Sequence, residues 1–234
     1  CGGKGAFIFG ENGKDVNAFA KVVAENMFYN QGQICSAPSV VHIPKKFKSE
    51  IVRAIATAAK GFEPQHPLSG NSVGLMISRD VVMRWRNALE QIEPVFFADE
   101  TQNLKLSEPL LSDWALRPTI LVDLPEEHDF WDLEIFAPIL LIRSYNDLSD
   151  AISHANKSKY GLACGVWSQD IDECMNIVTR LRAGNCHINS WGDDPNLVPF
   201  GGTKESGYGR EKSIETLSDY VYTKSIFYRP ANYS

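Results

Sequence analysis

The 234-residue sequence predicts an α/β fold with an open, mostly parallel β-sheet flanked by helices. Short apolar runs of strand type alternate along the chain with segments whose apolar residues recur at helical spacing. This alternation implies right-handed crossovers, which place helices on both faces of a parallel sheet. The composition agrees, since 44% hydrophobic and 22% charged residues are typical of a globular protein with a sizeable core.

The first half of the chain begins with an apolar strand at 6–9. A helix is expected over 15–29, because Val16, Phe19 and Val23 recur on one face. Ser78 is a suitable N-cap for a later helix whose apolar face continues to Ile92. Further strands are predicted at 40–43 and 95–98, and a further helix at 48–59.

The second half repeats the same alternation and ends in a different pattern. Strands are predicted at 120–122, 139–143, 163–167 and 186–189, and helices at 148–155 and 171–181. Residues 99–117 are polar and predict an irregular surface segment, whereas 191–208 are rich in Gly, Pro and Asp and predict a loop. In the tail, 220–228 alternates aromatic and aliphatic with polar residues, which predicts a strand that is exposed or paired with a partner chain.

Composition argues against several classes of function. With 23 basic and 29 acidic residues the net charge is −6, which disfavours nucleic acid as the main partner. No apolar run approaches the roughly 20 residues that span a bilayer, so no membrane segment is predicted. The five cysteines and five histidines lack metal-ligand spacing, so no metal site is expected. A disulfide framework is not expected either, which favours a reducing compartment, the cytoplasm.

Cys35 is the candidate nucleophile. It lies in the run Asn-Gln-Gly-Gln-Ile-Cys-Ser at 30–36, after a helix pattern and before a strand. Backbone N–H groups of such a turn favour the thiolate, which is the reactive form. Position alone leaves a buried structural cysteine equally open. By contrast Cys164, Cys174 and Cys186 lie inside predicted strands and a helix, so they are interpreted as structural.

Two further segments carry chemistry that is less specific. Glu134 and Phe136 precede a strand, where a carboxylate beside an aromatic ring could bind a ribose and stack on a ring, although a solvated Glu is the simpler interpretation. The glycine-dense run 199–211 is not a Walker A loop, and the chain has no GxGxxG fingerprint. We interpret 199–211 as a long loop held by tight turns.

Taken together, several ordered motifs resemble the catalytic half of the aldehyde dehydrogenase superfamily. Gly2-Gly3-Lys4 resembles the end of its Glu-Leu-Gly-Gly-Lys motif, and 30–35 is similar to the segment of its nucleophilic cysteine. The run 133–138 resembles its EIFGP motif, and 199–211 agrees with PFGGxKxSGxGRE in every fixed position. The segments 117–119, 160–162 and 183–189 follow in the family's order, so the resemblance covers essentially the whole chain.

The resemblance implies oxidation of a small-molecule aldehyde to an acid with NAD or NADP as cofactor. Cys35 would attack the carbonyl to give a thiohemiacetal, which passes hydride to the nicotinamide and becomes a thioester that water hydrolyses. Glu134 would bind the nicotinamide ribose, and Phe136 would pack against the nicotinamide end. Tyr29 and Phe200 fall where the family places aromatic residues around its substrate tunnel.

The resemblance also implies a division of the chain. Residues 1–215 correspond to the catalytic domain and 216–234 to a C-terminal oligomerisation segment, so a homodimer or homotetramer is expected. The family's general-base Glu falls immediately before position 1, and its oxyanion Asn and cofactor-binding domain fall further upstream. Without these groups the 234 residues alone are predicted to be inactive. Asn189 resembles the family's structural Asn at a strand end near the site.

The chain departs from the family's pattern at three positions, and other functions remain open. Leu133 replaces a Glu and Ala137 a Gly in the EIFGP motif, and Val81 stands where a ribose-binding Gln is frequent. A CoA-acylating dehydrogenase would use the same cysteine, and a non-catalytic scaffold would keep only the fold. A cysteine hydrolase would need a histidine near Cys35. Trp191, Asp193, Asp194 and Asn196 are expected near the tunnel mouth.

Overall fold

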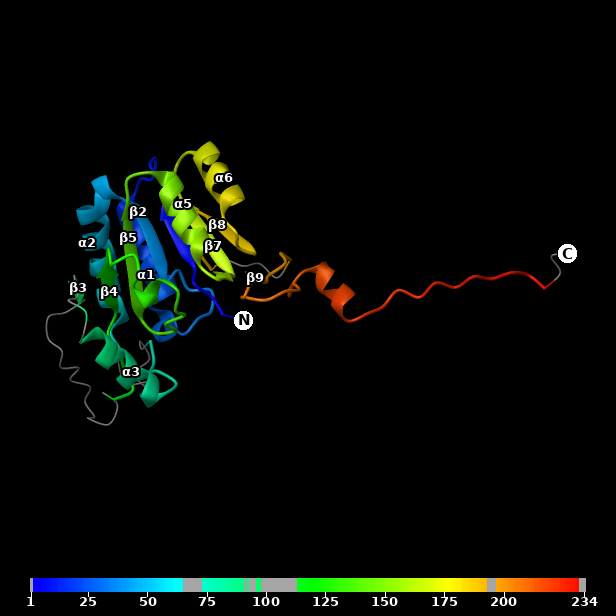
Figure 1. Cartoon of the computed structure of the whole chain (residues 1–234), viewed down its shortest axis with the longest axis horizontal. Coiled ribbons are helices and arrows are strands. Elements are labelled where there is room, and N and C mark those ends of the chain that lie inside the picture. The colour runs from blue at the N-terminus through cyan, green and yellow to red at the C-terminus, as the bar shows by residue number, and fades with distance from the viewer. Residues whose placement is uncertain are drawn as a thin grey trace.

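The structure is a computed structural model that describes residues 2–64, 73–90, 92, 96–97, 113–192 and 197–231 (Figure 1). Its centre is a seven-stranded sheet in the order β3-β4-β5-β2-β1-β7-β8. Six strands run parallel, and the short edge strand β3 is antiparallel to β4. The strands are β1 (Ala6–Phe9), β2 (Val40–Pro44), β3 (Phe96–Phe97), β4 (Thr119–Val122), β5 (Ile139–Tyr145), β7 (Ala163–Trp167) and β8 (Asn185–Ile188). The predicted open, mostly parallel sheet is confirmed.

Helices cover both faces of the sheet. They are α1 (Val16–Met27), α2 (Lys48–Ala59), α3 (Arg79–Leu89), α5 (Leu148–Lys157) and α6 (Ile171–Arg180). Helices α1 and α2 pack on one face of the sheet, and α5 and α6 pack on the other. Because successive side chains of a strand point to opposite faces, each pair of helices meets a different set of strand side chains. Short 3₁₀ turns lie at Tyr29–Gly32, Lys45–Phe47, Lys60–Phe62, Asp129–Trp131 and Ile214–Asp219.

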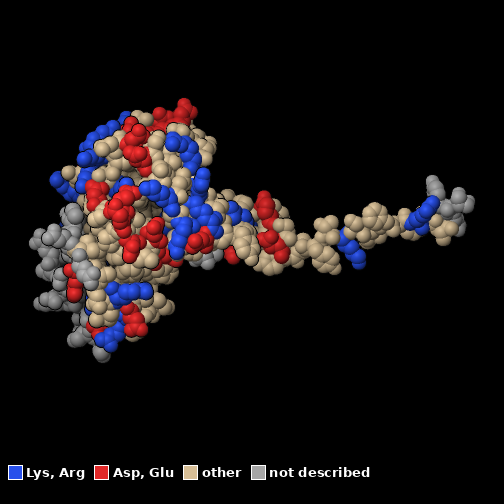
Figure 2. Space-filling view, in the orientation of Figure 1, with Lys and Arg blue, Asp and Glu red and all other residues tan. Residues whose placement is uncertain are grey.

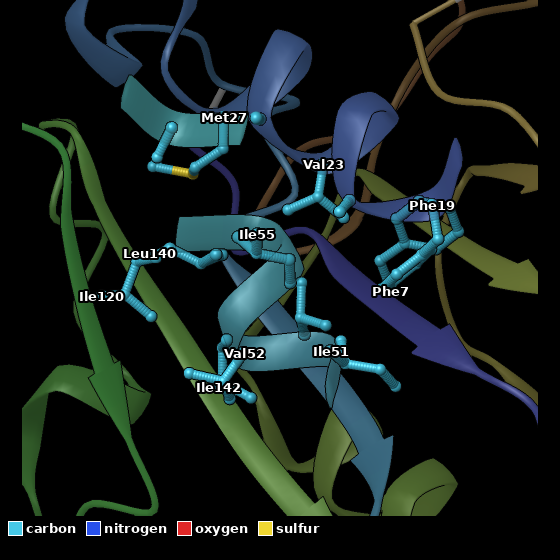
Figure 3. Close-up of a cluster of buried hydrophobic side chains, with 14 of the residues drawn as sticks. Phe7, Phe19, Val23, Met27, Ile51, Val52, Ile55, Ile120, Leu140 and Ile142 are labelled. Atoms are coloured by element: carbon cyan, nitrogen blue, oxygen red, sulfur yellow. The ribbon is translucent and has the colours of Figure 1, made fainter. Parts of the chain in front are cut away.

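The largest hydrophobic cluster lies between the sheet and the pair α1 and α2. Figure 3 shows Val23 of α1 and Ile55 of α2 beside Leu140 of β5, and all three are fully buried. Burial of side chains of this size stabilises a fold by roughly 1.5–3 kcal/mol each. Asp15 begins α1 by accepting a hydrogen bond from the backbone N–H of Ala18 at 3.0 Å. This packing fixes the position of the turn that follows α1.

The structure corrects three details of the sequence prediction, and a fourth lies partly outside the described residues. The helix expected over 15–29 ends at Met27 with Phe28 as its C-cap, and left-handed backbone angles follow from Asn30 onward. Ser78 occupies the N-cap position of α3 but makes no side-chain cap hydrogen bond. Of the strand predicted at 95–98 only 96–97 is described, and 98–112 lie outside the described residues. The predicted loop 191–208 contains β9 (Thr203–Lys204), which pairs with β6 (Tyr160–Gly161).

The C-terminal tail leaves the domain as an extended segment (Figure 1). After the 3₁₀ turn Ile214–Asp219, residues 221–230 form no strand within this single chain, so the strand expected at 220–228, exposed or paired with a partner chain, stays a prediction. Their side chains are exposed, and Figure 2 shows the tail projecting from the domain with few charges along it. On the domain face shown, acidic and basic side chains are interspersed. No described helix is long and apolar enough to cross a membrane.

Candidate active site

Cys35 lies on a tight turn between α1 and β2, and it is half-buried. Helix α1 ends because three consecutive residues, Asn30, Gln31 and Gly32, take positive φ angles of 49°, 56° and 68°. Left-handed angles cost little for Gly and Asn but are strained for Gln. Such strain persists only where the surroundings hold the backbone in place, and it is concentrated at functional sites.

Contacts from three distant segments hold this turn. The buried Gln31 accepts a hydrogen bond from the backbone N–H of Leu116 at 3.1 Å. Gln33 accepts one from the N–H of Ile77 at 2.8 Å. Gly32 packs so closely on the carbonyl of Ala137 that a Cβ there would lie 2.4 Å from the oxygen. The cysteine turn is therefore held by the amide side chains of Gln31 and Gln33 and by the close packing of Gly32.

The N-terminal segment passes directly beneath the cysteine. A Cβ built on Gly3 would lie 1.8 Å from the carbonyl oxygen of Cys35, and one on Gly5 would lie 2.3 Å from that of Ala37. No side chain fits such gaps, so the two backbones can touch only through glycine. The sequence showed Gly3 as part of a motif and gave Gly5 no role, and the contact of both with the cysteine turn depends on the fold.

Trp191 supports the turn from the other side. Its indole Nε1 donates a hydrogen bond to the backbone carbonyl of Ser36 at 2.8 Å. The ring stacks on His187 of β8 and packs against Phe7 of β1, with centroids 5.2 and 4.9 Å away. The residue after Cys35 is thus tied to the loop that follows β8. Trp191, expected at the tunnel mouth, is instead buried, with 5% of its surface exposed. A lone tryptophan in a loop gives no local signal of such partners.

Glu134 and Phe136 reach the same place from a third segment. The Oε1 atom of Glu134 accepts a hydrogen bond from the backbone N–H of Gly3 at 3.0 Å. Phe136 has a positive φ of 52° and is 41% exposed, so its ring is available at the surface. A narrow crevice is lined by Gly32 and Ile34 of the cysteine turn together with Glu134 and Phe136. The crevice therefore joins Glu134 and Phe136 to the turn that carries Cys35, although Cys35 itself is not among its lining residues.

Lys4 is a buried cation beside this segment. Its Nζ donates a hydrogen bond to the carbonyl of Leu133 at 2.8 Å. Burial lowers the pKa of Lys4 to about 7, against the opposing effect of the carboxylates of Asp132 and Glu134. Gly3 and Lys4 therefore tie the N-terminal segment to two consecutive residues, Glu134 and Leu133.

The two predicted tunnel residues lie in different surroundings. Tyr29 begins the 3₁₀ turn before Cys35, and its side chain is 62% exposed. Phe200 pairs with Glu211 through two backbone hydrogen bonds of 2.8 and 2.7 Å, and Lys212 lies over its ring. Phe200 is therefore fixed within the glycine-rich run. The role of Tyr29 and Phe200 in a substrate tunnel stays a proposal. Residues 193–196, expected at the tunnel mouth, lie outside the described residues.

The glycine-rich run 199–211 also contacts the N-terminal segment. Ser206 is buried, donates a hydrogen bond to the carbonyl of Gly2 at 2.6 Å and accepts one from the N–H of Gly161 at 2.9 Å. The run is a loop held by tight turns, as predicted, with β9 inside it. Asn189 ends β8 with a positive φ and binds both backbone groups of Ser168 at 2.8 Å, which agrees with a structural Asn.

Comparison with known proteins identifies the family. The profile of the Aldehyde dehydrogenase family matches residues 1–226, nearly the whole chain. The chain belongs to this family. The resemblance carried by the motifs at 2–4, 30–35, 133–138 and 199–211 is thereby confirmed.

Individual aldehyde dehydrogenases support the assignment. The chain is 30% identical over 231 residues to the NADP/NAD-dependent aldehyde dehydrogenase PuuC of Escherichia coli (strain K12), covering 97% of this chain and 45% of the relative. It is 29% identical over 228 residues to the betaine aldehyde dehydrogenase of Vibrio vulnificus (strain YJ016), and the match covers 97% of this chain and 47% of that relative. The chain therefore spans about half the length of the curated relatives it matches.

Solved aldehyde dehydrogenase structures share the fold. The Mycobacterium tuberculosis enzyme complexed with NAD⁺ is 30% identical and superposes with a TM-score of 0.84, covering 100% of this chain and 48% of the other. The aldehyde dehydrogenase KauB from Pseudomonas aeruginosa is 26% identical with a TM-score of 0.84, covering 94% and 44%. The homologues are NAD(P)-dependent aldehyde dehydrogenases, and NAD⁺ complexes occur among the structural neighbours.

Proposed function

We propose that this chain is the catalytic part of an NAD(P)-dependent aldehyde dehydrogenase and that Cys35 is its nucleophile. The observation that carries the proposal is the convergence of three family motifs at Cys35: the glycine segment beneath it, its own strained turn, and Glu134 with Phe136 across the crevice. A scaffold that had lost its chemistry would have no need to keep all three together.

The Cys35 sulfur attacks the aldehyde carbonyl and forms a thiohemiacetal. Its position on a half-buried turn leaves the thiol reachable, while the turn's backbone is held by Gly32, Gln31 and Trp191. A positioned nucleophile replaces an encounter in solution with a unimolecular step, which lowers the barrier substantially. After oxidation the acyl group remains on Cys35 as a thioester, and its hydrolysis releases the acid and restores the thiol.

The residues around the crevice fit the nicotinamide end of a dinucleotide. The Glu134 carboxylate is half-buried and held by Gly3, so it is oriented to accept hydrogen bonds from ribose hydroxyls. Phe136 presents an exposed ring beside it for packing against a flat heterocycle. When bound, NAD(P) supplies the hydride acceptor for the oxidation. The two residues hold and orient that cofactor, and Lys4 keeps the segment before Glu134 in place.

The tail is proposed to hold the subunits of a homo-oligomer together. Residues 216–234 would form the oligomerisation segment, and 1–215 the catalytic domain. The apolar side chains of the tail support this proposal, since they are exposed in the single chain. They are Leu217, Tyr220, Val221, Tyr222, Ile226, Phe227 and Tyr228.

Replacement of Cys35 in the full-length protein tests the function. Cys35→Ser is expected to abolish aldehyde-dependent formation of NAD(P)H and to leave the folded structure unchanged, because the side chain is similar in size. Cys174→Ser is the matched control, since Cys174 lies on α6 with its thiol buried against the sheet and does not line the crevice. Retention of activity in Cys35→Ser would refute the proposal. The 234 residues alone are expected to show no activity, and detectable NAD(P)H formation would refute that expectation.

A further inference from the structure

Two other cysteines form a close pair at the edge of the sheet. Cys164 of β7 and Cys186 of β8 are register partners on adjacent parallel strands, and β8 is the last strand of the sheet. Their Sγ atoms lie 2.9 Å apart. Neighbouring strands are about 4.8 Å apart, which falls within the Cα separations of about 4.4–6.8 Å found in disulfides. The two sulfurs need to approach by only about 0.9 Å to reach the bonded distance.

The two thiols have unequal surroundings. Cys186 is exposed, whereas Cys164 is only 3% exposed and belongs to the cluster beneath α6. A hydrogen bond from the Cys164 thiol lowers the pKa of Cys186, and the same hydrogen bond together with burial raises the pKa of Cys164. The exposed sulfur is therefore the better nucleophile, and the buried one keeps its proton. This asymmetry is typical of a reactive cysteine beside a resolving cysteine.

Cys174 provides a contrast on the same side of the sheet. It is buried in α6, and its thiol donates to the carbonyl of Ser168, with 3.7 Å between sulfur and oxygen. The sequence interpretation of Cys174 as a small buried side chain therefore agrees with its surroundings. The same interpretation misses the Cys164–Cys186 pair, because their 22-residue separation becomes a contact only through the pairing of β7 with β8.

We propose that Cys164 and Cys186 form a reversible disulfide when the protein meets a hydroperoxide. The Cys186 thiolate attacks the peroxide, breaks the O–O bond and becomes a sulfenic acid, while the alcohol or water leaves. The Cys164 sulfur then displaces the sulfenic oxygen, which departs as water with the Cys164 proton. Two thiols are oxidised and one hydroperoxide is reduced. A dithiol reductant reverses the reaction by thiol–disulfide exchange.

The Cys164–Cys186 disulfide would link the edge strand β8 covalently to β7. Among the described residues, strand β8 has a hydrogen-bonded neighbouring strand on one side only, and an edge element of this kind opens more readily than a central one. The loop that follows β8 carries Trp191, which holds the carbonyl of Ser36. Oxidation is therefore expected to raise the unfolding temperature by about 5–10 °C through closure of a loop of some 20 residues.

Peptide mapping of the full-length protein tests the proposal without measuring activity. After treatment with hydrogen peroxide, tryptic digestion without reductant should yield fragment 160–180 linked to fragment 183–204, about 2 Da below the sum of the two. Both Cys164 and Cys174 lie in the first fragment, so the variants separate them. Cys174→Ser should retain the linked product, and Cys164→Ser should lose it and accumulate a sulfinic or sulfonic acid at Cys186.

Two outcomes would overturn the assignment. A linked product that persists in Cys164→Ser and disappears in Cys174→Ser would make Cys174 the partner. Sulfinic acid at Cys186 in the unsubstituted protein, with no linked product, would mean that the pair does not close. The rise in unfolding temperature should disappear on treatment with dithiothreitol and should be absent from Cys164→Ser. Cys35→Ser should leave all of these results unchanged, which separates this proposal from the function of Cys35.

Discussion

Glu134 accepts a hydrogen bond from the backbone N–H of Gly3 at 3.0 Å, although 131 positions separate the two residues. Gly3 in turn lies against the carbonyl of Cys35. One glycine therefore touches both the proposed nucleophile and the proposed ribose ligand. The relative position of Cys35 and Glu134 therefore depends on the absence of a side chain at Gly3.

The first prediction concerns this glycine. Gly3→Ala would place a Cβ 1.8 Å from the Cys35 carbonyl oxygen, so one of the two backbones must move. We expect a loss of about 1–3 kcal/mol in the free energy of unfolding, as for overpacked sites, and a large loss of activity. Urea denaturation and a kinetic assay measure the two effects. Gly61→Ala is the control, because its Cβ would meet nothing within 4 Å. Equal behaviour of both variants would contradict the proposed contact.

The second prediction separates the two roles of Glu134. Glu134→Gln keeps an oxygen that can accept the hydrogen bond from Gly3 but removes the charge, so stability should change little while NAD(P) binding weakens about tenfold. Glu134→Ala removes both the charge and the hydrogen bond to Gly3, and we expect a further loss of about 1 kcal/mol in the free energy of unfolding. Titration of bound NAD(P)H fluorescence and urea denaturation distinguish the effects. Unchanged cofactor affinity in both variants would exclude Glu134 from the ribose site.

The third prediction uses two tryptophans as a matched pair. Trp191→Phe keeps an aromatic ring but removes the hydrogen bond to Ser36, and Trp167→Phe removes a similar bond of 2.7 Å to the carbonyl of Lys14. Each should cost about 1 kcal/mol of stability. Only Trp191→Phe should also change the rate at which iodoacetamide alkylates Cys35, followed by mass spectrometry. An equal change in both variants would mean that Trp191 has no special influence on the cysteine turn.

The fourth prediction concerns acid sensitivity. His42 and His154 face each other beneath α5 with ring centroids 5.2 Å apart. Burial lowers the pKa of His154 to about 4, and burial with the nearby His154 and Arg143 lowers that of His42 well below 6.5. The unfolded chain thus binds more protons than the folded one between pH 6.5 and 4, so stability falls as the pH drops through this range.

Substitution of one histidine checks the source of this sensitivity. His154→Phe keeps an aromatic ring against Trp131 and removes one titrating group. We expect a smaller decrease in unfolding temperature between pH 6.5 and 4 than in the unsubstituted protein, with His42 responsible for part of what remains. Calorimetry across this pH range measures the difference. An unchanged pH dependence would show that His154 is not the source.

The fifth prediction concerns the tail. Deletion of residues 216–234 should convert a homo-oligomer into monomers while leaving the unfolding of the remaining domain nearly unchanged, because the tail side chains are exposed in the single chain. Phe227→Asp should have a similar effect, since its ring is 96% exposed and available to a partner. Sedimentation velocity measures the assembly, with Lys224→Ser as a control in the same segment. An unchanged oligomer after deletion would exclude the tail as the interface.

The sequence by itself determined the local elements and the family. Helix α2 and strand β1 have the bounds expected from their periodicity, because side-chain spacing along a few turns or residues is a local property. The motifs at 30–35 and 199–211 identified the family for the same reason, since the order of residue types is in the chain itself. The end of α1 and the two-residue strands β6 and β9 were missed, because neither left-handed turns nor such short strands have a period.

The tertiary structure alone decided which of these elements meet. Gly3 reaches Cys35 and Glu134, Trp191 reaches Ser36, and the Sγ atoms of Cys164 and Cys186 come within 2.9 Å only because the strand order places β1 between β2 and β7 and pairs β7 with β8. Strand order follows from how apolar faces are buried over the whole domain, and no local pattern encodes it. The chemistry of the site therefore depends on long-range packing as much as on its motifs.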